Sequence, residues 1–379
     1  MANPGALDTS FGAGGKKTIN FGGTDAARVV LVQSNGRIVV AGGGGAAGAF
    51  CVARLRTNGT LDTTFGSGGK RVVDFGGAND TVFGAALQAD GKIVLAGDSD
   101  LRVAVARLKP NGVLDASFEG DGKKIFSWGP IGRAQAVVMA PNGKILIGGF
   151  SGPEGGNIEV ARLNANGLLD KTFGVGGRSA IDFGGDDFGL AMARQANGRI
   201  LVAGRSTVAG AVVARLRANG VLDPDFDGDG RVALPGSASA SAVLVQPDRN
   251  IVVAGNTAGD DMMTVTRLTP NGSLDPTFGT GGTATIDFGP LADITGGAAL
   301  QPDGKIVVAG YSQDTEDVAL ARLNANGSPD PTFGTAGKAT VDFGVATFGF
   351  AVALQPNGRI VVAGQKTGKD DFAVARLMG

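Results

Sequence analysis

The chain has 379 residues, a formal net charge of −1 and no histidine. This near-neutral charge provides no overall field to attract nucleic acid or an anionic membrane, and no apolar run approaches the roughly 18 residues of a membrane-spanning helix. The single cysteine, Cys51, excludes an intrachain disulfide. The 66 glycines follow no collagen period and recur at turn positions, which indicates many short strands.

One phrase, centred on Asp-x-x-Phe, recurs along the whole chain. Its aspartates are spaced 52 to 55 residues apart: Asp8, Asp62, Asp115, Asp170, Asp223, Asp275 and Asp330. Seven copies at so steady a period predict seven stacked units of one supersecondary type.

Each unit contains four predicted strands, as the first full repeat illustrates. Its β-branched, apolar runs are residues 27–33, 37–41, 50–55 and 70–75, with hairpin turns at Asn35-Gly36 and Asn58-Gly59. Strands that are apolar on both faces need cover on both faces, which neighbouring blades of a propeller provide. We therefore predict an all-β fold, a single seven-bladed β-propeller over residues 1–379 with four antiparallel strands in each blade.

The order of the predicted strands also predicts how the ring closes. The chain starts with an outer strand at residues 16–21 and ends with a third strand at residues 372–377. We expect residues 1–23 to provide the outer strand of the last blade, so that both chain ends are tied into one sheet.

The repeat resembles the bacterial delta-60 repeat family, which forms tandem arrays in large secreted or surface proteins. The phrases that carry the resemblance are residues 61–70 (LDTTFGSGGK), 301–310 (QPDGKIVVAG) and 372–377 (FAVARL). The resemblance implies a propeller fold, no catalytic motif, and an extracellular or cell-surface location. Residues 1–5 lack the basic and apolar regions of a signal peptide, so this location rests on the resemblance alone.

Residues that recur in every repeat are predicted to be structural. An arginine ends each third strand, and six of these arginines precede the next aspartate by eight residues, as Arg54 precedes Asp62. We predict an Arg–Asp pair that fixes the connection to the fourth strand, because a ligand site needs asymmetry between repeats.

Carboxylates of the less regular loops are the candidate ligand-binding residues. The predicted topology places two sets of loops, and their acids, on one face around the central channel. These residues are Asp25, Asp80, Asp186, Asp187, Asp260, Asp261, Asp293, Asp314, Asp317, Asp370 and Asp371. Solvated loop acids without a ligand are the alternative.

The loop that contains Asp225, Asp227 and Asp229 is the candidate metal site. Its Asp-x-Asp-x-Asp-Gly pattern begins like a calcium loop, but Gly236 stands where an EF-hand has its bidentate acid. Bound calcium and a plain connection decorated with acids are both open; no other cofactor is predicted.

The absence of histidine excludes Ser-His-Asp and Cys-His nucleophiles and histidine-ligated metals. We predict a non-catalytic binding or scaffold propeller of an exported bacterial protein, monomeric, that binds a protein, carbohydrate or small molecule on the acidic face. The alternatives are a carboxylate- or calcium-dependent hydrolase or lyase acting on a carbohydrate or ester at the channel mouth, and a purely structural spacer.

Overall fold

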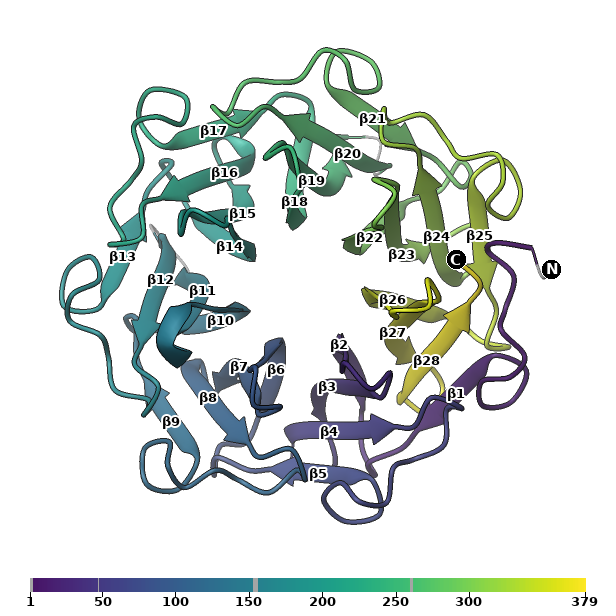
Figure 1. Cartoon of the computed structure of the whole chain (residues 1–379), viewed down its shortest axis with the longest axis horizontal. Helices are drawn as coiled ribbons and strands as arrows, with labels where there is room; N and C mark the ends of the chain where they lie inside the picture. The colour runs from purple at the N-terminus through teal and green to yellow at the C-terminus, as the bar shows by residue number, and fades with distance from the viewer. Residues whose placement is uncertain (1–2, 47, 153–155, 260–261) are drawn as a thin grey trace.

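The predicted strands form, and they assemble into seven four-stranded antiparallel sheets arranged around one axis (Figure 1). The computed structural model describes residues 3–46, 48–152, 156–259 and 262–379. No helix among these residues is long and apolar enough to cross a membrane. The prediction of an all-β, seven-bladed propeller is confirmed.

Each blade runs from an inner strand beside the axis to a short outer strand. From inner to outer, blades 1 to 4 are β2 (Ala26–Val32), β3 (Ile38–Gly44), β4 (Ala49–Leu55), β5 (Lys70–Val73); β6 (Asp80–Leu87), β7 (Ile93–Ser99), β8 (Arg102–Leu108), β9 (Lys123–Phe126); β10 (Gly132–Met139), β11 (Ile145–Ser151), β12 (Ile158–Leu163), β13 (Arg178–Ile181); and β14 (Asp187–Arg194), β15 (Ile200–Ser206), β16 (Gly210–Leu216), β17 (Arg231–Leu234). Blades 5 to 7 are β18 (Ser237–Val245), β19 (Ile251–Thr257), β20 (Met263–Leu268), β21 (Thr283–Ile286); β22 (Asp293–Leu300), β23 (Ile306–Ser312), β24 (Asp317–Leu323), β25 (Lys338–Val341); and β26 (Thr347–Leu354), β27 (Ile360–Lys366), β28 (Asp371–Leu377), β1 (Lys16–Ile19).

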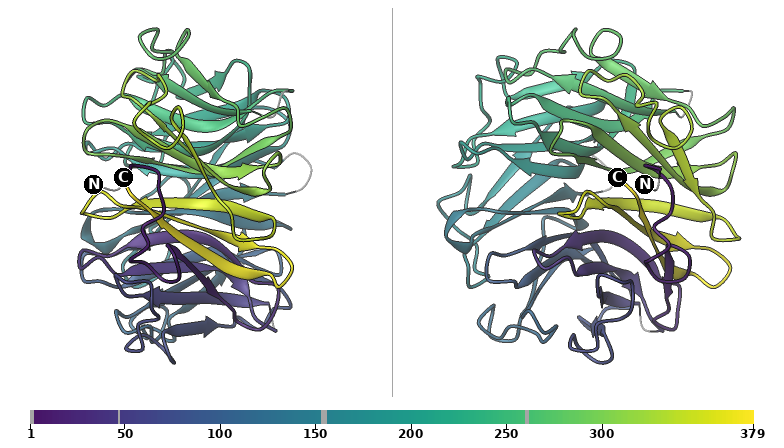
Figure 2. Two further views of the ribbon diagram at one scale, coloured as in Figure 1. Left: turned by 90° about the vertical axis from the view of Figure 1, so that its right-hand side faces the viewer. Right: turned by 45° about the vertical axis from the view of Figure 1, so that its right-hand side comes forward.

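The first strand of the chain closes the ring by pairing with the last. Lys16 to Ile19 of β1 face Ala375 to Phe372 of β28 in antiparallel register. Next to this pair the amide of Gly5 donates to the carbonyl of Met378, so the first and last described segments lie side by side (Figure 2). The predicted closure is confirmed, and it ties both ends of the described chain into blade 7.

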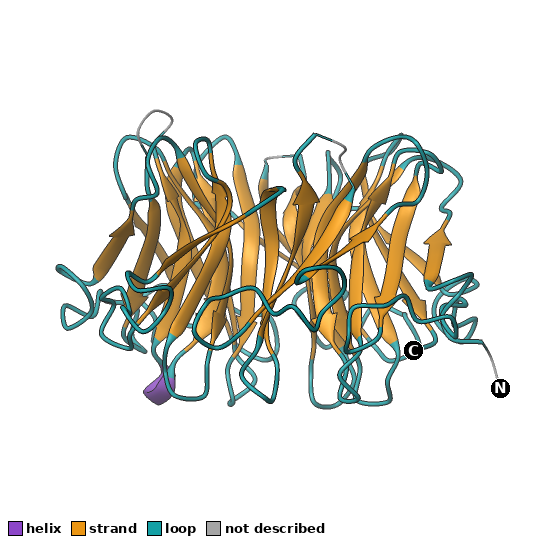
Figure 3. Ribbon diagram, turned by 90° about the horizontal axis from the view of Figure 1, so that it is seen from above, coloured by secondary structure: helices purple, strands orange, loops and turns teal. Residues whose placement is uncertain are grey.

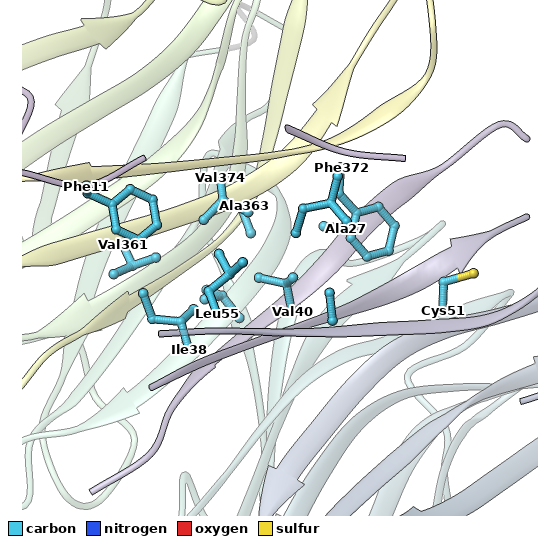
Figure 4. Close-up of a cluster of buried hydrophobic side chains, with 13 residues drawn as sticks. Phe11, Ala27, Ile38, Val40, Cys51, Leu55, Val361, Ala363, Phe372 and Val374 are labelled. Carbon is cyan, nitrogen blue, oxygen red and sulfur yellow. The ribbon is translucent and has the colours of Figure 1, made fainter. Parts of the chain in front are cut away.

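The hydrophobic core consists of layers between neighbouring blades. Between blades 7 and 1, Phe11, Val361 and Phe372 pack against Ile38 and Leu55, all of them at most 2% exposed (Figure 4). The phenylalanines of the Asp-x-x-Phe phrase are fully buried in these layers: Phe11, Phe65, Phe118, Phe173, Phe226, Phe278 and Phe333. The ring buries the apolar faces of its strands because each blade covers the next.

The strands run between two faces of the ring (Figure 3). We call one the loop face; it carries the connections from each outer strand to the next blade and from the second to the third strand, such as residues 74–79 and 100–101 in blades 1 and 2. We call the other the turn face; it carries connections such as residues 33–37 and 56–69, and the one 3-10 turn of the described chain, Pro141–Gly143.

Candidate binding site at the channel mouth

The repeated arginines and aspartates meet on the turn face, and their geometry is structural. In blade 1, Arg54 donates from Nε to Oδ2 of Asp62 at 2.8 Å and from Nη2 to the hydroxyl of Thr64 at 3.0 Å. Its guanidinium also donates to the carbonyl of Pro110 in the next blade and lies over the ring of Phe65. The six equivalent pairs have the same Nε–Oδ2 contact at 2.7 to 2.9 Å: Arg107–Asp115, Arg162–Asp170, Arg215–Asp223, Arg267–Asp275, Arg322–Asp330 and Arg376–Asp8. The predicted Arg–Asp pair is confirmed in every blade.

A second cation from the hairpin between the first two strands joins six of these pairs. The cations are Arg37, Lys92, Lys144, Arg199, Lys305 and Arg359, each in contact with the aspartate of its own blade. Burial alone would raise the pKa of Asp62, but hydrogen bonds from Thr64 and the charges of Arg54 and Arg37 outweigh it and hold this pKa below its usual value. Each of these turn-face cations is thereby paired with an aspartate of the fold.

Four of the predicted ligand-binding carboxylates are buried at the start of inner strands. Asp25, Asp80, Asp187 and Asp293 are at most 1% exposed. In each, Oδ2 accepts a hydrogen bond from the backbone amide of the phenylalanine that follows the preceding outer strand, as Asp187 accepts from Phe183 at 2.6 Å. Burial raises the pKa of Asp187 and of Asp293. These carboxylates hold the connection between blades, and their side chains are withdrawn from the solvent.

The other predicted acids lie at the rim of the loop face, where several accept local hydrogen bonds. Asp186 accepts from the amide of Gly156 at 3.2 Å and Asp314 from the amide of Leu291 at 2.8 Å. Asp317, Asp370 and Asp371 are partly exposed near the start of third strands. Asp260 and Asp261 lie outside the described residues. Among the residues that the structure describes, no three acidic or thiol side chains gather closely enough to hold a metal ion.

The three predicted calcium ligands lie in the connection between β16 and β17 on the turn face. Asp225 pairs with Arg199 at 2.7 Å and Asp229 with Arg231 at 2.8 Å, while Asp227 occupies a turn position with φ of 52°. Calcium at this loop would have to replace two ion pairs. It stays a prediction from the sequence.

The repeats differ at the wall of the channel, where every inner strand contains a β-bulge. The register between the first two strands shifts at the same place in all seven blades, for example between Ala27 and Val29. The extra residues at these shifts are Arg28, Phe83, Gln135, Leu190, Ser241, Gly296 and Phe350. A bulge re-aims a side chain, and these seven residues line one cavity of about 240 Å³, together with Thr295.

Aromatic and arginine side chains stack along this wall toward the loop face. The Cζ atom of Arg28 lies 3.9 Å from the ring centroid of Phe350. The Phe350 ring is parallel to that of Phe348, whose centroid lies 4.3 Å from that of Tyr311. A second group lies on other blades: Arg133 over Phe83 at 5.0 Å and Arg205 over Phe188 at 4.5 Å. The described part of the channel mouth thus presents flat apolar surfaces next to positive charge.

A hollow of about 640 Å³ on the loop face borders the same arginine. It is lined by Arg28, Gly43, Gly44, Thr81 and Gln365, among others. The second strands of the other blades carry larger residues where blade 1 has Gly43: Asp98, Phe150, Arg205, Asn256, Tyr311 and Gln365. Gly43 has no side chain to separate the hollow from the channel at blade 1. Arg28 therefore borders both the channel cavity and the hollow.

The residues of the channel wall are not among those predicted from the sequence, which are loop carboxylates. The signal was present in the alignment of the repeats: the position of Arg28 holds six different residue types in seven blades, while the flanking positions stay small or aliphatic. The register shift that turns this position toward the channel appears only once strand pairing is known.

Comparison with known proteins agrees with the repeat and the fold. The family model described as "Domain of unknown function (DUF5122) beta-propeller" matches residues 33–65, 88–118, 140–173, 195–226, 246–278, 301–333 and 355–379. The chain belongs to this family. The resemblance to a tandem-repeat propeller family is thereby confirmed, while the delta-60 name stays a prediction. No curated protein matches the chain.

Several solved propellers have a fold similar to that of this DUF5122 chain but share little of its sequence. Virginiamycin B lyase from Staphylococcus aureus with quinupristin, a catalytically inactive variant in which alanine replaces a histidine, is 10% identical with a TM-score of 0.63, over 96% of this chain and 99% of that one. YCF48 bound to D1 peptide is 11% identical (TM-score 0.55; 100% and 98% covered). The WD40 domain of Toxoplasma gondii coronin is 12% identical (TM-score 0.55; 100% and 87% covered). At these identities the likeness shows the fold alone.

Proposed function

We propose that the chain is a non-catalytic binding propeller that takes its ligand at the mouth of the channel on the loop face. The observation that carries the proposal is the contrast between two sets of residues. The repeated Arg–Asp pairs on the turn face are satisfied within the fold, whereas the seven bulge residues of the channel are of six different types. A site for one ligand needs a few polar groups at particular places, so its residues differ between blades, whereas the stability of the ring does not need such differences.

The proposed site lies on the loop face, as the sequence predicts, but the residues proposed to contact the ligand are the bulge residues of the channel in place of the loop carboxylates. Arg28, Phe83 and Phe350 line the cavity, while the exposed acids such as Asp314 stand farther out on the loops. The solved propellers of similar shape include one with quinupristin and one bound to a peptide, so a propeller of this kind is a suitable scaffold for binding. Export from a bacterial cell remains part of the proposal and rests on the family resemblance.

The alternative is a carboxylate-dependent hydrolase or lyase at the same mouth, and Asp98 is the residue that favours it. This carboxyl is 5% exposed and lies 3.4 Å from Arg133. Burial raises its pKa against the opposing charge of Arg133, and the nearby charge of Asp80 adds to the effect of burial. A buried carboxyl of raised pKa beside a second one is suited to general acid catalysis. Hydrolysis of an ester or glycoside panel, lost in Asp98→Asn, would support this alternative.

The test is a thermal-shift screen of the wild-type chain with monosaccharides, amino acids and aromatic acids at about 5 mM, because a ligand that binds only the folded state raises Tm. Each compound that raises Tm is measured again with Phe350→Ala and with Asp314→Asn. Loss of the shift in Phe350→Ala alone supports the channel mouth. Loss in Asp314→Asn alone supports the acidic rim instead, and no shift with any compound supports a structural spacer.

A further inference from the structure

The structure assigns to Arg28 a binding site for a small aromatic carboxylate, seated where the channel cavity meets the hollow of blade 1. The inference rests on the proposed function and names the chemistry of its ligand. Its basis is one guanidinium that is half-buried, stacked on an aromatic ring and open to two cavities.

The charge of Arg28 has no acidic counterpart among the residues that the structure describes. Within the described part of the chain no carboxylate forms an ion pair with it, and its Nε is buried without a hydrogen-bond partner. Burial lowers the pKa of Arg28, and the charge of Arg133 lowers it further. A guanidinium that is partly withdrawn from water and unpaired is unfavourable, and an anion that binds it relieves this cost.

The repeated arginines of the turn face differ from Arg28 in having a carboxylate partner. Arg54 and its six equivalents each lie over a phenylalanine as Arg28 does, but each also has a buried aspartate. At Arg28 the aromatic ring is present, and the described residues provide no carboxylate beside it. The planar fork of a guanidinium matches a carboxylate in a bidentate pair, so the ligand's acid group is expected to fill that place.

The surroundings of Arg28 define the rest of the ligand. Phe83, Leu190 and Phe350 form apolar parts of the cavity wall, and Gln135 and Ser241 add neutral polar groups. A cavity of about 240 Å³ is smaller than the 300 Å³ or more of drug-sized sites. It suits a single aromatic ring with a short acid side chain, which enters through the hollow beside Gly43.

The experiment measures binding of phenylacetate, acetate and 2-phenylethanol to the full chain by isothermal titration calorimetry. Phenylacetate should bind the wild type at least tenfold more tightly than either partial analogue, because only it offers both charge and ring. Arg28→Gln should weaken phenylacetate binding by tenfold or more. The matched control is Arg205→Gln, which removes another arginine stacked on phenylalanine at the same face but lines neither cavity, and it should bind as the wild type does.

Loss of folding is separated from loss of binding by thermal melting. Arg28→Gln removes a half-buried charge for which the described residues provide no carboxylate, and it should melt close to the wild type. Phenylacetate binding that is unchanged in Arg28→Gln, or absent from the wild type, would overturn the inference.

The same measurements separate this inference from the proposed function. If 2-phenylethanol binds as tightly as phenylacetate and both are lost in Phe350→Ala, the channel mouth binds ligands but the acid is not recognised. If binding survives both Arg28→Gln and Phe350→Ala, both proposals fail.

Discussion

Arg376 donates a hydrogen bond from Nε to Oδ2 of Asp8 at 2.8 Å, across 368 residues of chain. The same pair recurs within each of the other repeats over eight residues, as between Arg54 and Asp62. The Arg–Asp pair that is local in the other blades therefore joins the two ends of the chain in blade 7. We call the Arg376–Asp8 pair the clasp.

We expect Asp8→Ala to lower the free energy of unfolding by about 3 kcal/mol, because it leaves the guanidinium of Arg376, which is 4% exposed, without its carboxylate. Chemical denaturation measures the change. Asp303→Ala is the control. This side chain is 56% exposed, and its carboxylate forms a long ion pair of 3.8 Å with Lys305, so its removal should cost less than about 0.5 kcal/mol. Equal losses in the two variants would contradict the role of the clasp.

Stability should fall steeply in acid because of the seven repeated aspartates. Burial would raise their pKa values, but hydrogen bonds and neighbouring cations hold the pKa of each below its usual value: Asp8, Asp62, Asp115, Asp170, Asp223, Asp275 and Asp330. A lowered folded-state pKa adds stability that is complete above the unfolded value of about 4 and is lost as the pH falls toward the folded value. Denaturant midpoints should therefore drop below about pH 4; midpoints unchanged down to pH 2.5 would contradict this assignment.

Glu159 should act in the opposite direction. Burial raises the pKa of this side chain to about 7, against a hydrogen bond from Ser151 and the charge of Arg178. The folded state then holds a proton that the unfolded state releases above about pH 4.3, so this contribution to stability is lost as the pH rises toward 7. Glu159→Gln should stabilise the protein by on the order of 3 kcal/mol at pH 8 and change little at pH 4. A pH-independent effect in denaturation experiments would show that Glu159 does not titrate in this range.

Blade 4 departs from the repeat at Asp225, and restoring the repeat should stabilise it. Six blades carry a serine or threonine there that bonds both the arginine and the aspartate, as Thr64 does with Arg54 and Asp62. Asp225 instead forms an exposed pair with Arg199. Asp225→Thr should add about 1 kcal/mol to the free energy of unfolding, since it gains partly buried hydrogen bonds and loses a surface ion pair.

The reverse substitution, Thr64→Asp, is the control for this prediction and should destabilise blade 1. Calcium added to the wild type and to Asp225→Thr also tests the predicted metal loop. A rise in Tm that only the wild type shows would support calcium at Asp225, Asp227 and Asp229.

The sequence by itself determined the number of blades, their strands, the closure by residues 16–19 and the pairing of Arg54 with Asp62, because these follow from a period and from residues at fixed spacing. Only the tertiary structure decided where the individual loop carboxylates lie. Asp25 and Asp186 look alike in sequence, yet the first is fully buried under backbone amides and the second is partly exposed. The tertiary structure also decided that Arg28 faces the channel, because a bulge of one residue in strand pairing reverses the direction of a side chain, and pairing is a property of two strands together.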